Sequence, residues 1–545
     1  MSLRRKSGQP SSTTIQRSFG ALQSKTFDLG VIGAGPVGAG VARRAAAAGL
    51  SVALLESTDY SSGLVANPAR LLSRHSGRSW FAHMKYLREA AYEHRQLHQM
   101  APHVVQPATM IAPIRDKLTS MKFRFSLAHY ESPAVVSTGE RAQRWDRKRL
   151  ADQEPILDGG LFSGAWLYRD FLVDEARLVL ALLRDASRFG AECANYVCVN
   201  TITQKSGRYF LNSRDELSGR EFAVRCQSVV DTVTPRFGPN RESDFCFAKN
   251  VHIAVPQQKL PLKYPMVMET ADKGSVFAIP QGQVTYLGAA NLRASAEIDS
   301  EMTASEADIQ YLLSPLLNYF SIEEVRPIDV VASWAGLHPM LNDASIAGTQ
   351  IPRGREVIVD RDDIIRIRGG DSVIHDLLAE EALSHVRKVL DRSVSLDYEL
   401  GPLPGSKFSR QADLAEALSC PISAEIKYVK TRYNIDEATA RRLVRLYGDD
   451  VVTVLGEEPV ALSQSVFVEE VDWAVLEEGA LTLEDILYRR LRCVWFEPQE
   501  LMLLLPALTE RAAILLEWDA LEQTRQRIAF EDRLALDLAA VPLAD

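Results

Sequence analysis

Three glycines and one glutamate near the start of the chain have the types and spacing needed to hold a nucleotide through its phosphates and ribose. They are Gly33, Gly35, Gly38 and Glu56. The first glycine allows a tight turn, the second a close approach of pyrophosphate to the backbone, and the third close packing of a helix on a strand. Glu56 is placed to accept hydrogen bonds from both hydroxyls of an adenosine ribose, and its charge opposes a 2′-phosphate.

The elements that must position these residues surround them in the sequence. Residues 27–32 form an apolar strand, an alanine-rich helix follows the glycines and stops at Gly49, and a second apolar strand ends on Glu56. The glycine spacing alone is a weak signal, but the whole order is that of a dinucleotide-binding βαβ unit. The helix N-terminus would offer free N–H groups and about half a positive charge to the pyrophosphate.

A second strand–glycine–helix corner lies far along the chain. A strand over 364–367 runs into Gly369 and Gly370, and a helical pattern follows them. Such a corner can direct another helix N-terminus at the same ligand. We therefore expect both glycines to take part in cofactor binding.

Composition excludes several classes of protein. The 545 residues carry a net charge of −9 and are 46% hydrophobic, which suits two or three domains with cores and gives no support to nucleic-acid binding. The six cysteines show no CxxC pair and no zinc spacing, so no metal site is expected. No apolar run reaches the roughly 18 residues that a membrane-spanning helix needs.

The rest of the chain divides into recognisable regions. Residues 1–26 are rich in Ser, Thr and Arg and are predicted to form a disordered basic tail. Residues 160–200 have a strand–helix–strand pattern, and residues 200–300 alternate apolar and polar positions as an antiparallel sheet does. After the Gly- and Pro-rich stretch 401–405, residues 406–535 are predicted to form an all-α domain.

Several segments carry a resemblance that extends well beyond the glycines. Matching motifs are Ala101–His103, Val173–Val179 (VDEARLV), Phe277–Pro280 with Leu287-Gly288, Trp334–Pro339 (WAGLHP), Gly369-Gly370, and a C-terminal set of Glu470, Val471, Trp473, Glu478, Thr482, Asp485, Arg489 and Arg490. The chain resembles the FAD-dependent, quinone-linked glycerol-3-phosphate dehydrogenases from about residue 27 to residue 500.

The resemblance implies a fold, a cofactor and a reaction. The expected α/β fold is a glutathione-reductase-type FAD-binding Rossmann domain with an antiparallel-sheet substrate domain over 27–400, followed by the C-terminal all-α domain. The family passes a hydride from a secondary alcohol to flavin N5 and hands the electrons to quinone. The implied partners are a small polyol or hydroxy substrate, phosphorylated in the family, and a second copy of the chain. The implied location is cytoplasmic, with peripheral contact to the inner face of the membrane.

Three residues follow from the resemblance as catalytic candidates. His252 occupies the histidine position of the family's KGSH motif and would act as the base; its alternative role is that of a hydrogen-bonded core histidine. Arg353 is what remains of a family Arg-Asp motif and would anchor an anion. His338 stands where the family's WAGLRP motif has arginine.

The remaining site positions depart from the family pattern. Residues 66–78 align with a flavin-wrapping loop but carry Arg74 and His75 at its glycines, and Asp371 replaces a lysine. Loss of cations at positions 77 and 338 predicts phosphate binding weaker by about a hundredfold, because a charge-assisted hydrogen bond contributes roughly 1.5–3 kcal/mol. The alternatives are a catalytically inactive family member kept as a nucleotide-binding or regulatory module, and an NAD-dependent dehydrogenase.

Overall fold

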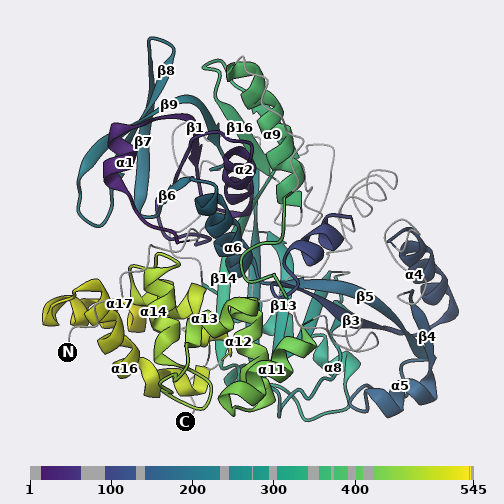
Figure 1. Cartoon of the computed structure of the whole chain (residues 1–545). Helices are drawn as coiled ribbons and strands as arrows, with labels where there is room; N and C mark the ends of the chain where they lie inside the picture. Colours follow the sequence, from purple (N-terminus) through teal and green to yellow (C-terminus); the bar gives the residue numbers. More distant parts are fainter. Residues whose placement is uncertain are drawn as a thin grey trace.

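The computed structural model describes most of the chain. The described residues are 14–62, 92–130, 141–233, 245–272, 274–293, 303–341, 355–369, 374–390, 400–408, 422–496, 498–538 and 541. They form two large sheets and a helical region, which Figure 1 shows with the first sheet above and the helices below.

The first sheet carries the predicted βαβ unit at its centre. Its strand order is β15-β16-β9-β1-β2-β6, with β7 and β8 continuing from β9. The strands are β1 (Thr26–Ile32), β2 (Val52–Leu55), β6 (Glu192–Ala194), β7 (Val197–Lys205), β8 (Arg208–Asp215), β9 (Glu221–Asp231), β15 (Arg355–Val359) and β16 (Ile365–Gly369). β1 pairs in parallel with both β2 and β9, so their carboxyl ends meet at one edge.

Three helices pack together beside this sheet. α2 (Pro36–Ala47) contacts both α6 (Glu175–Arg188) and α9 (His375–Leu390). α6 begins where the sequence predicts, because Asp174 caps it by accepting a hydrogen bond from the Arg177 N–H at 3.1 Å. Gly40 allows close packing on α9, since a Cβ there would lie 2.9 Å from Cδ2 of His375.

The second sheet has the order β14-β10-β13-β12-β11-β3-β5-β4. Its strands are β3 (Val105–Ile114), β4 (Gln143–Asp146), β5 (Gly164–Val173), β10 (Phe245–Pro256), β11 (Met266–Glu269), β12 (Ser275–Gln281), β13 (Val284–Arg293) and β14 (Ala332–Leu341). The sheet is antiparallel except where β11 runs parallel to β3. The predicted antiparallel strands within 200–300 are present, but β7–β9 belong to the first sheet and β10–β13 to the second.

Helices cover one face of the second sheet and continue to the end of the described chain. They are α11 (Ser423–Tyr433), α12 (Glu437–Tyr447), η4 (Gly448–Asp450), α13 (Val451–Leu455), α14 (Val468–Leu476), the π-helix η5 (Asp485–Arg490), α15 (Cys493–Phe496), α16 (Pro498–Leu516) and α17 (Ala520–Leu538). One hydrophobic core joins them to the sheet, with Trp334 and Tyr286 packed among Ile486 and Leu508. This region is helical as expected.

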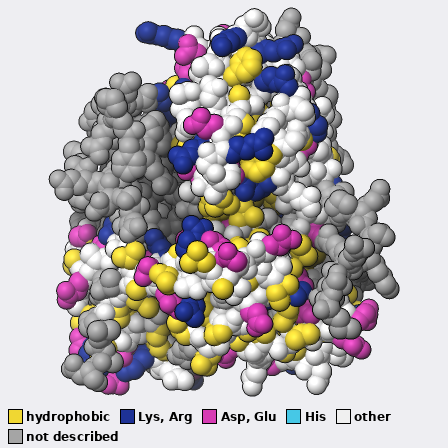
Figure 2. Space-filling view, turned by 90° about the vertical axis from the view of Figure 1, so that its left-hand side faces the viewer, with side chains coloured by type: hydrophobic (Ala, Val, Ile, Leu, Met, Phe, Trp, Pro, Cys, Tyr) yellow, Lys and Arg dark blue, Asp and Glu magenta, His cyan; other side chains and the backbone are white. Residues whose placement is uncertain are grey.

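Further helices lie elsewhere in the described part of the chain. They are α1 (Phe19–Ser24), α4 (Lys117–Tyr130), α5 (Arg147–Gln153), α7 (Glu306–Leu313), α8 (Leu316–Tyr319) and η2 (Pro327–Asp329). In the part of the chain that the structure describes, no helix combines the length and the apolar character required to cross a bilayer. Figure 2, which faces the side of α1 and α17, shows acidic and basic side chains interspersed over the helical lower part.

The predicted disordered tail over 1–26 is wrong for residues 14–26. Ile15 and Leu22 are buried, and the Ile15 N–H donates a 3.0 Å hydrogen bond to the carbonyl of Glu477. α1 then leads directly into β1, and the ring of Phe19 meets that of Phe222 edge-on at 5.4 Å. The apolar residues spaced along this Ser- and Thr-rich stretch account for its order, because each fills a place in a core.

Candidate functional site

The turn after β1 has the geometry that the glycine spacing predicts. Gly33 has φ of +96°, and a Cβ there would lie 2.6 Å from Oγ1 of Thr232 at the end of β9. A Cβ on Gly38 would lie 1.9 Å from the Gly33 carbonyl oxygen. Both positions therefore require glycine, one for its backbone conformation and both for contact distance.

Gly35 differs from its two neighbours because it faces open space. A Cβ at Gly35 would meet no described atom within 4 Å. Gly35 is also the N-cap of α2, and no side chain caps the helix, which has Pro36 at its first turn. A bare helix N-terminus beside a backbone without a side chain is the arrangement that accepts a pyrophosphate.

Glu56 fixes the glycine turn as well as standing at the end of β2. Its Oε2 accepts a 2.7 Å hydrogen bond from the Ala34 N–H, and its Oε1 accepts one of 3.1 Å from the Thr58 N–H. The carboxylate therefore connects the glycine turn to the segment after β2. Oε1 also accepts hydrogen bonds from the hydroxyls of Ser57 and Thr58, whereas Oε2 accepts only the Ala34 N–H among the described residues and keeps a lone pair for a further donor, such as a ribose hydroxyl.

The second predicted corner ends at the same edge of the sheet. β16 pairs in parallel with β9, placing Arg366 opposite Asp231, and Asp231 lies opposite Ile32 at the end of β1. Gly369, with φ of +68°, is the last residue of β16. Gly370 and Asp371 lie outside the described residues, so the role predicted for Gly370 stays a prediction.

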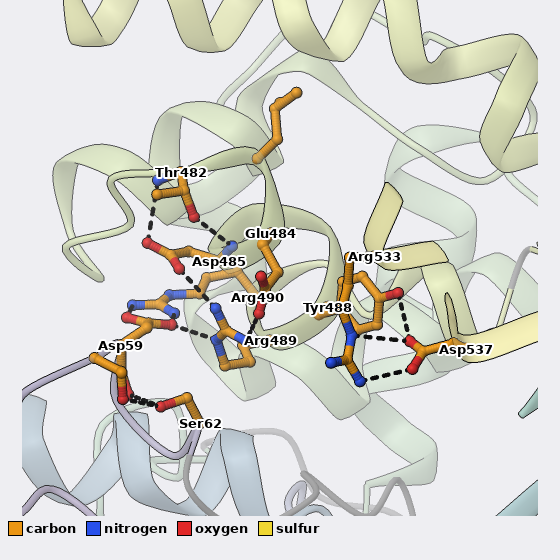
Figure 3. A network of polar contacts seen from close by, with 12 residues as sticks. Asp59, Ser62, Thr482, Glu484, Asp485, Tyr488, Arg489, Arg490, Arg533 and Asp537 are labelled. Carbon is orange, nitrogen blue, oxygen red and sulfur yellow. Dashed lines mark hydrogen bonds and ion pairs between the residues drawn. The ribbon is translucent and has the colours of Figure 1, made fainter. Parts of the chain in front are cut away.

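Figure 3 shows a group of buried charges around Asp59. Asp59 follows β2 and is 1% exposed, and both Arg489 and Arg490 of η5 point toward it. The Nε atom of Arg489 lies 2.5 Å from Oδ2 of Asp59, and Arg490 Nη2 donates to Oδ1 at 2.9 Å. The Ser61 N–H in the same segment donates to the Ala34 carbonyl at 3.2 Å, so these charges support the turn itself.

The charges in this group set one another's ionisation. Burial alone would raise the pKa of Asp59, but the guanidinium groups of Arg490 and Arg489 lower it to about 2. Burial raises the pKa of Asp485, and the charge of Asp59 adds to that effect. Removing either carboxylate would leave arginines buried with too little negative charge around them.

A second ion pair joins α6 to the C-terminal helices. Arg177 binds the Glu478 carboxylate with both terminal nitrogens, at 2.8 and 2.7 Å, and the Trp473 indole N–H donates to the same carboxylate at 3.2 Å. Burial would raise the pKa of Glu478, but Arg177 outweighs it and lowers that pKa. The family-like motifs that contain Arg177 and Glu478 lie far apart in the sequence. In the fold they are in direct contact.

His252 lies on the second sheet within a group of aromatic rings. Its side chain is 3% exposed and stacks on Trp334 of β14, with ring centroids 5.3 Å apart and planes at 8°. Phe277 lies at 5.4 Å on another side. Gly288, opposite His252 on β13, makes room for the ring, since a Cβ there would lie 2.4 Å from His252 Cδ2.

Of the other two catalytic candidates, the described structure places only the backbone of His338, and it does not bring it next to His252. The backbone of His338 lies in β14 opposite Ala248, whereas His252 pairs with Trp334. Four residues of strand separate the two pairings, a distance of about 13 Å. Arg353 lies outside the described residues, as does the loop 66–78 with Arg74 and His75.

Sequence reasoning missed the buried charges that hold the nucleotide corner. Asp59 lies in a polar segment that resembles an ordinary loop, and Asn195, which donates to Asp59 at 3.0 Å, follows a short strand. The available signal was the motif containing Asp485, Arg489 and Arg490. Paired charges within an otherwise apolar helical segment indicate buried ion pairs with a partner elsewhere in the chain.

Comparisons with known proteins identify related families. Residues 28–362 match the family model described as FAD dependent oxidoreductase, and residues 402–523 match the model described as C-terminal domain of alpha-glycerophosphate oxidase. The chain is 26% identical over 559 residues to the aerobic glycerol-3-phosphate dehydrogenase of Bacillus subtilis, covering 98% of this chain and 99% of that protein. A relative from Staphylococcus epidermidis is 25% identical, with 95% and 96% covered.

Two solved structures share the fold. The glycerol-3-phosphate dehydrogenase from Bacillus halodurans complexed with FAD superimposes with a TM-score of 0.73 at 22% identity, covering 96% of this chain and 98% of the other. L-alpha-glycerophosphate oxidase from Mycoplasma pneumoniae, with FAD bound, has a TM-score of 0.52 at 14% identity, covering 68% and 96%. The predicted α/β architecture, with an FAD-binding Rossmann sheet, a second sheet and a helical C-terminal region, is confirmed.

Proposed function

Because this chain belongs to the FAD dependent oxidoreductase family, we propose that it oxidises the secondary alcohol of a small, glycerol-phosphate-like substrate. The observation that carries the proposal is that two family models cover the chain in sequence, the second being that of the alpha-glycerophosphate oxidase C-terminal domain. The alignment with glycerol-3-phosphate dehydrogenases supports it, since it covers nearly the whole length of both proteins.

The residues at the first corner fit the adenosine end of FAD. Gly35 leaves space at the uncapped N-terminus of α2, where the pyrophosphate of a dinucleotide would lie. We propose Gly33, Gly35, Gly38, Glu56, Gly369 and Gly370 as cofactor-binding residues. Bound flavin supplies a two-electron acceptor for hydride.

We propose His252 as the base that takes the hydroxyl proton of the substrate. A neutral imidazole is an effective base near neutral pH, and Gly288 leaves the space that the ring needs on the sheet. The stacked Trp334 holds the ring in one plane, which fixes the direction of its nitrogens. Arg353 remains proposed as the group that binds the anionic end of the substrate, and His338 as a further residue of the catalytic site.

Anaerobic reduction of the bound flavin tests this function directly. Purified protein should be yellow, and sn-glycerol 3-phosphate should bleach its visible absorbance, whereas glycerol at the same concentration should not. Dihydroxyacetone phosphate should appear in an amount equal to the flavin reduced. A colourless protein that does not bind added FAD would contradict the redox function. Bleaching by unphosphorylated donors alone would exclude a phosphate-bearing substrate.

We further propose that electrons leave to quinone at a membrane surface that α4 contacts. Leu118, Met121 and Phe125 are 63%, 71% and 53% exposed, and their spacing places them on one face of the helix beside Lys117 and Arg124. Apolar side chains flanked by cations suit the interface of an anionic bilayer. Substituting Glu for Met121 should reduce sedimentation with anionic vesicles several-fold, and Leu503→Glu on α16 is the control.

The cytoplasmic location and the homodimer stay predictions.

A further inference from the structure

A cavity of about 460 Å³ lies away from the glycine turn, where three parts of the molecule meet. It is lined by the turn between β12 and β13, by residues around His103 and Asp174, and by the C-terminal helices α12 and α16. Figure 1 shows α12 in front of β13 and below α6. The volume is that of a small-molecule site, and none of the proposed cofactor or catalytic residues lines it.

Arg442 of α12 lines this cavity, and two of its side-chain nitrogens have no hydrogen-bond acceptor among the described residues. Its side chain is 9% exposed, and Nη2 donates to the Glu470 carboxylate at 2.6 Å and also to the Ser465 carbonyl. Its Nε and Nη1 atoms are buried and have no acceptor among the described residues. Buried N–H groups on a cation are costly to leave unpaired, so an acceptor within the cavity would be strongly favoured.

The cavity also holds a buried acceptor that lacks a donor. Oε2 of Glu500 on α16 has no hydrogen-bond partner in the part of the chain that the structure describes. The two aspartates of the lining are already used, because Asp174 binds Arg492 at 3.1 Å and Asp436 accepts the Thr439 N–H at 2.7 Å. The unmet requirements are therefore an oxygen acceptor beside Arg442 and a donor beside Glu500.

We propose that this cavity binds a small hydroxylated oxyanion, with its carboxylate or phosphate on Arg442 and a hydroxyl donating to Glu500. Amide side chains of Gln106, Gln281, Gln283 and Gln464 surround the cavity and can bind further hydroxyls. Such a ligand contacts the second sheet, the start of α6 and the C-terminal helices at once. It therefore stabilises the packing of these helices on the rest of the molecule.

Calorimetric titration of the FAD-loaded protein tests the site with two probes and a neutral control. D-gluconate supplies a hydroxylated carboxylate, D-glucose 6-phosphate a hydroxylated phosphate, and sorbitol the hydroxyls without the anion. At least one of the two anions should bind and sorbitol should not; the anion that binds identifies the anionic group. Hydrogen exchange should slow in the 281–283 turn and in α12, which locates the ligand away from the flavin.

Two variants separate the site from the stability of the fold. Arg442→Lys keeps the positive charge beside Glu470 and removes the guanidinium N–H groups that lack an acceptor. Glu500→Gln removes the negative charge of the carboxylate and keeps the size of the side chain. Each should weaken binding at least tenfold while flavin reduction is unchanged, and Glu510→Gln, on the exposed side of α16, should bind as the parent does. Undiminished binding by both cavity variants, protection only near the flavin, or no binding of either anion would overturn the proposal.

Discussion

At the turn after β1, backbone lies against backbone and buried ion pairs hold the flanking segment, whereas around His252 aromatic rings lie against one another. A Cβ at Gly38 would lie 1.9 Å from a carbonyl oxygen, and the nearest charges form the Asp59 group. His252 has Trp334 and Phe277 as ring neighbours. The turn after β1 is thus fixed by backbone contacts that leave no room for an added atom, and the surroundings of His252 by packing between side chains.

The largest expected effect is that of Gly38→Ala. The added methyl group must displace the Gly33 carbonyl, so the turn should open and the purified protein should lose most of its FAD. Gly35→Ala is the matched variant, because its methyl group meets open space. It should leave the melting temperature of the FAD-free protein unchanged and still weaken FAD at least tenfold. Flavin content and thermal denaturation measure both, and equal behaviour of the two variants would contradict the comparison.

Asp59→Asn tests the buried charges. The substitution leaves Arg489 and Arg490 underneutralised in the interior, which should lower the free energy of unfolding by about 3–5 kcal/mol. Chemical denaturation gives this quantity. Glu192→Gln, whose partner Lys25 is 57% exposed, is the control and should change it by less than about 1 kcal/mol. Similar losses in the two variants would mean that the Asp59 group adds no more than a surface pair.

His252→Asn tests the aromatic end. If His252 is the base, the rate of flavin reduction by substrate should fall about a hundredfold or more, with FAD still bound. Stopped-flow absorbance measures the rate, and Trp334→Phe is a companion that keeps the ring stack. A rate within a few-fold of the parent's would leave His252 with a packing role alone.

The most gradual effect concerns pH. Burial lowers the pKa of His103 from 6.5 to about 3, and the charges of Arg177 and Arg184 act in the same direction. Between these values the unfolded chain binds a proton that the folded chain does not, so stability falls as the pH falls from 6.5 toward 3. The slope from one such group is at most about 1.4 kcal/mol per pH unit. His103→Gln should flatten the dependence of the unfolding free energy on pH in that window, which chemical denaturation at several pH values measures.

Short-range sequence patterns predicted the glycine turn after β1. They did not predict the buried charges that support it. Gly33, Gly35 and Gly38 could be predicted because the conformation and the close contacts that require glycine in a turn involve residues only a few positions apart. Asp59 could not, because its arginine partners lie in η5, more than 400 residues away. The alternation in 200–300 predicted strands correctly, but the same period serves both sheets and so cannot assign β9 to one of them.

The proposed catalytic set stays a prediction. His252 lies on β10 of the second sheet, whereas Arg353 and the loop 66–78 lie outside the described residues. Nothing in the structure explains why this chain has His338 where the WAGLRP motif of the resembling family has arginine. The domain boundaries at 406–535 stay a prediction, and the hydrophobic core of the C-terminal helices includes Trp334 of β14 as well as Ile486.

The ion pair between Asp59 and Arg490 also bears on how the protein is made. The two residues are 431 positions apart, so the ribosome needs roughly 20–90 s after Asp59 before the arginine exists. During that interval β1, α2 and β2 can form, but the segment after β2 holds an unneutralised acid that cannot yet be buried. We therefore expect cofactor binding to follow the synthesis of Arg490, and translation products truncated before that residue should be colourless.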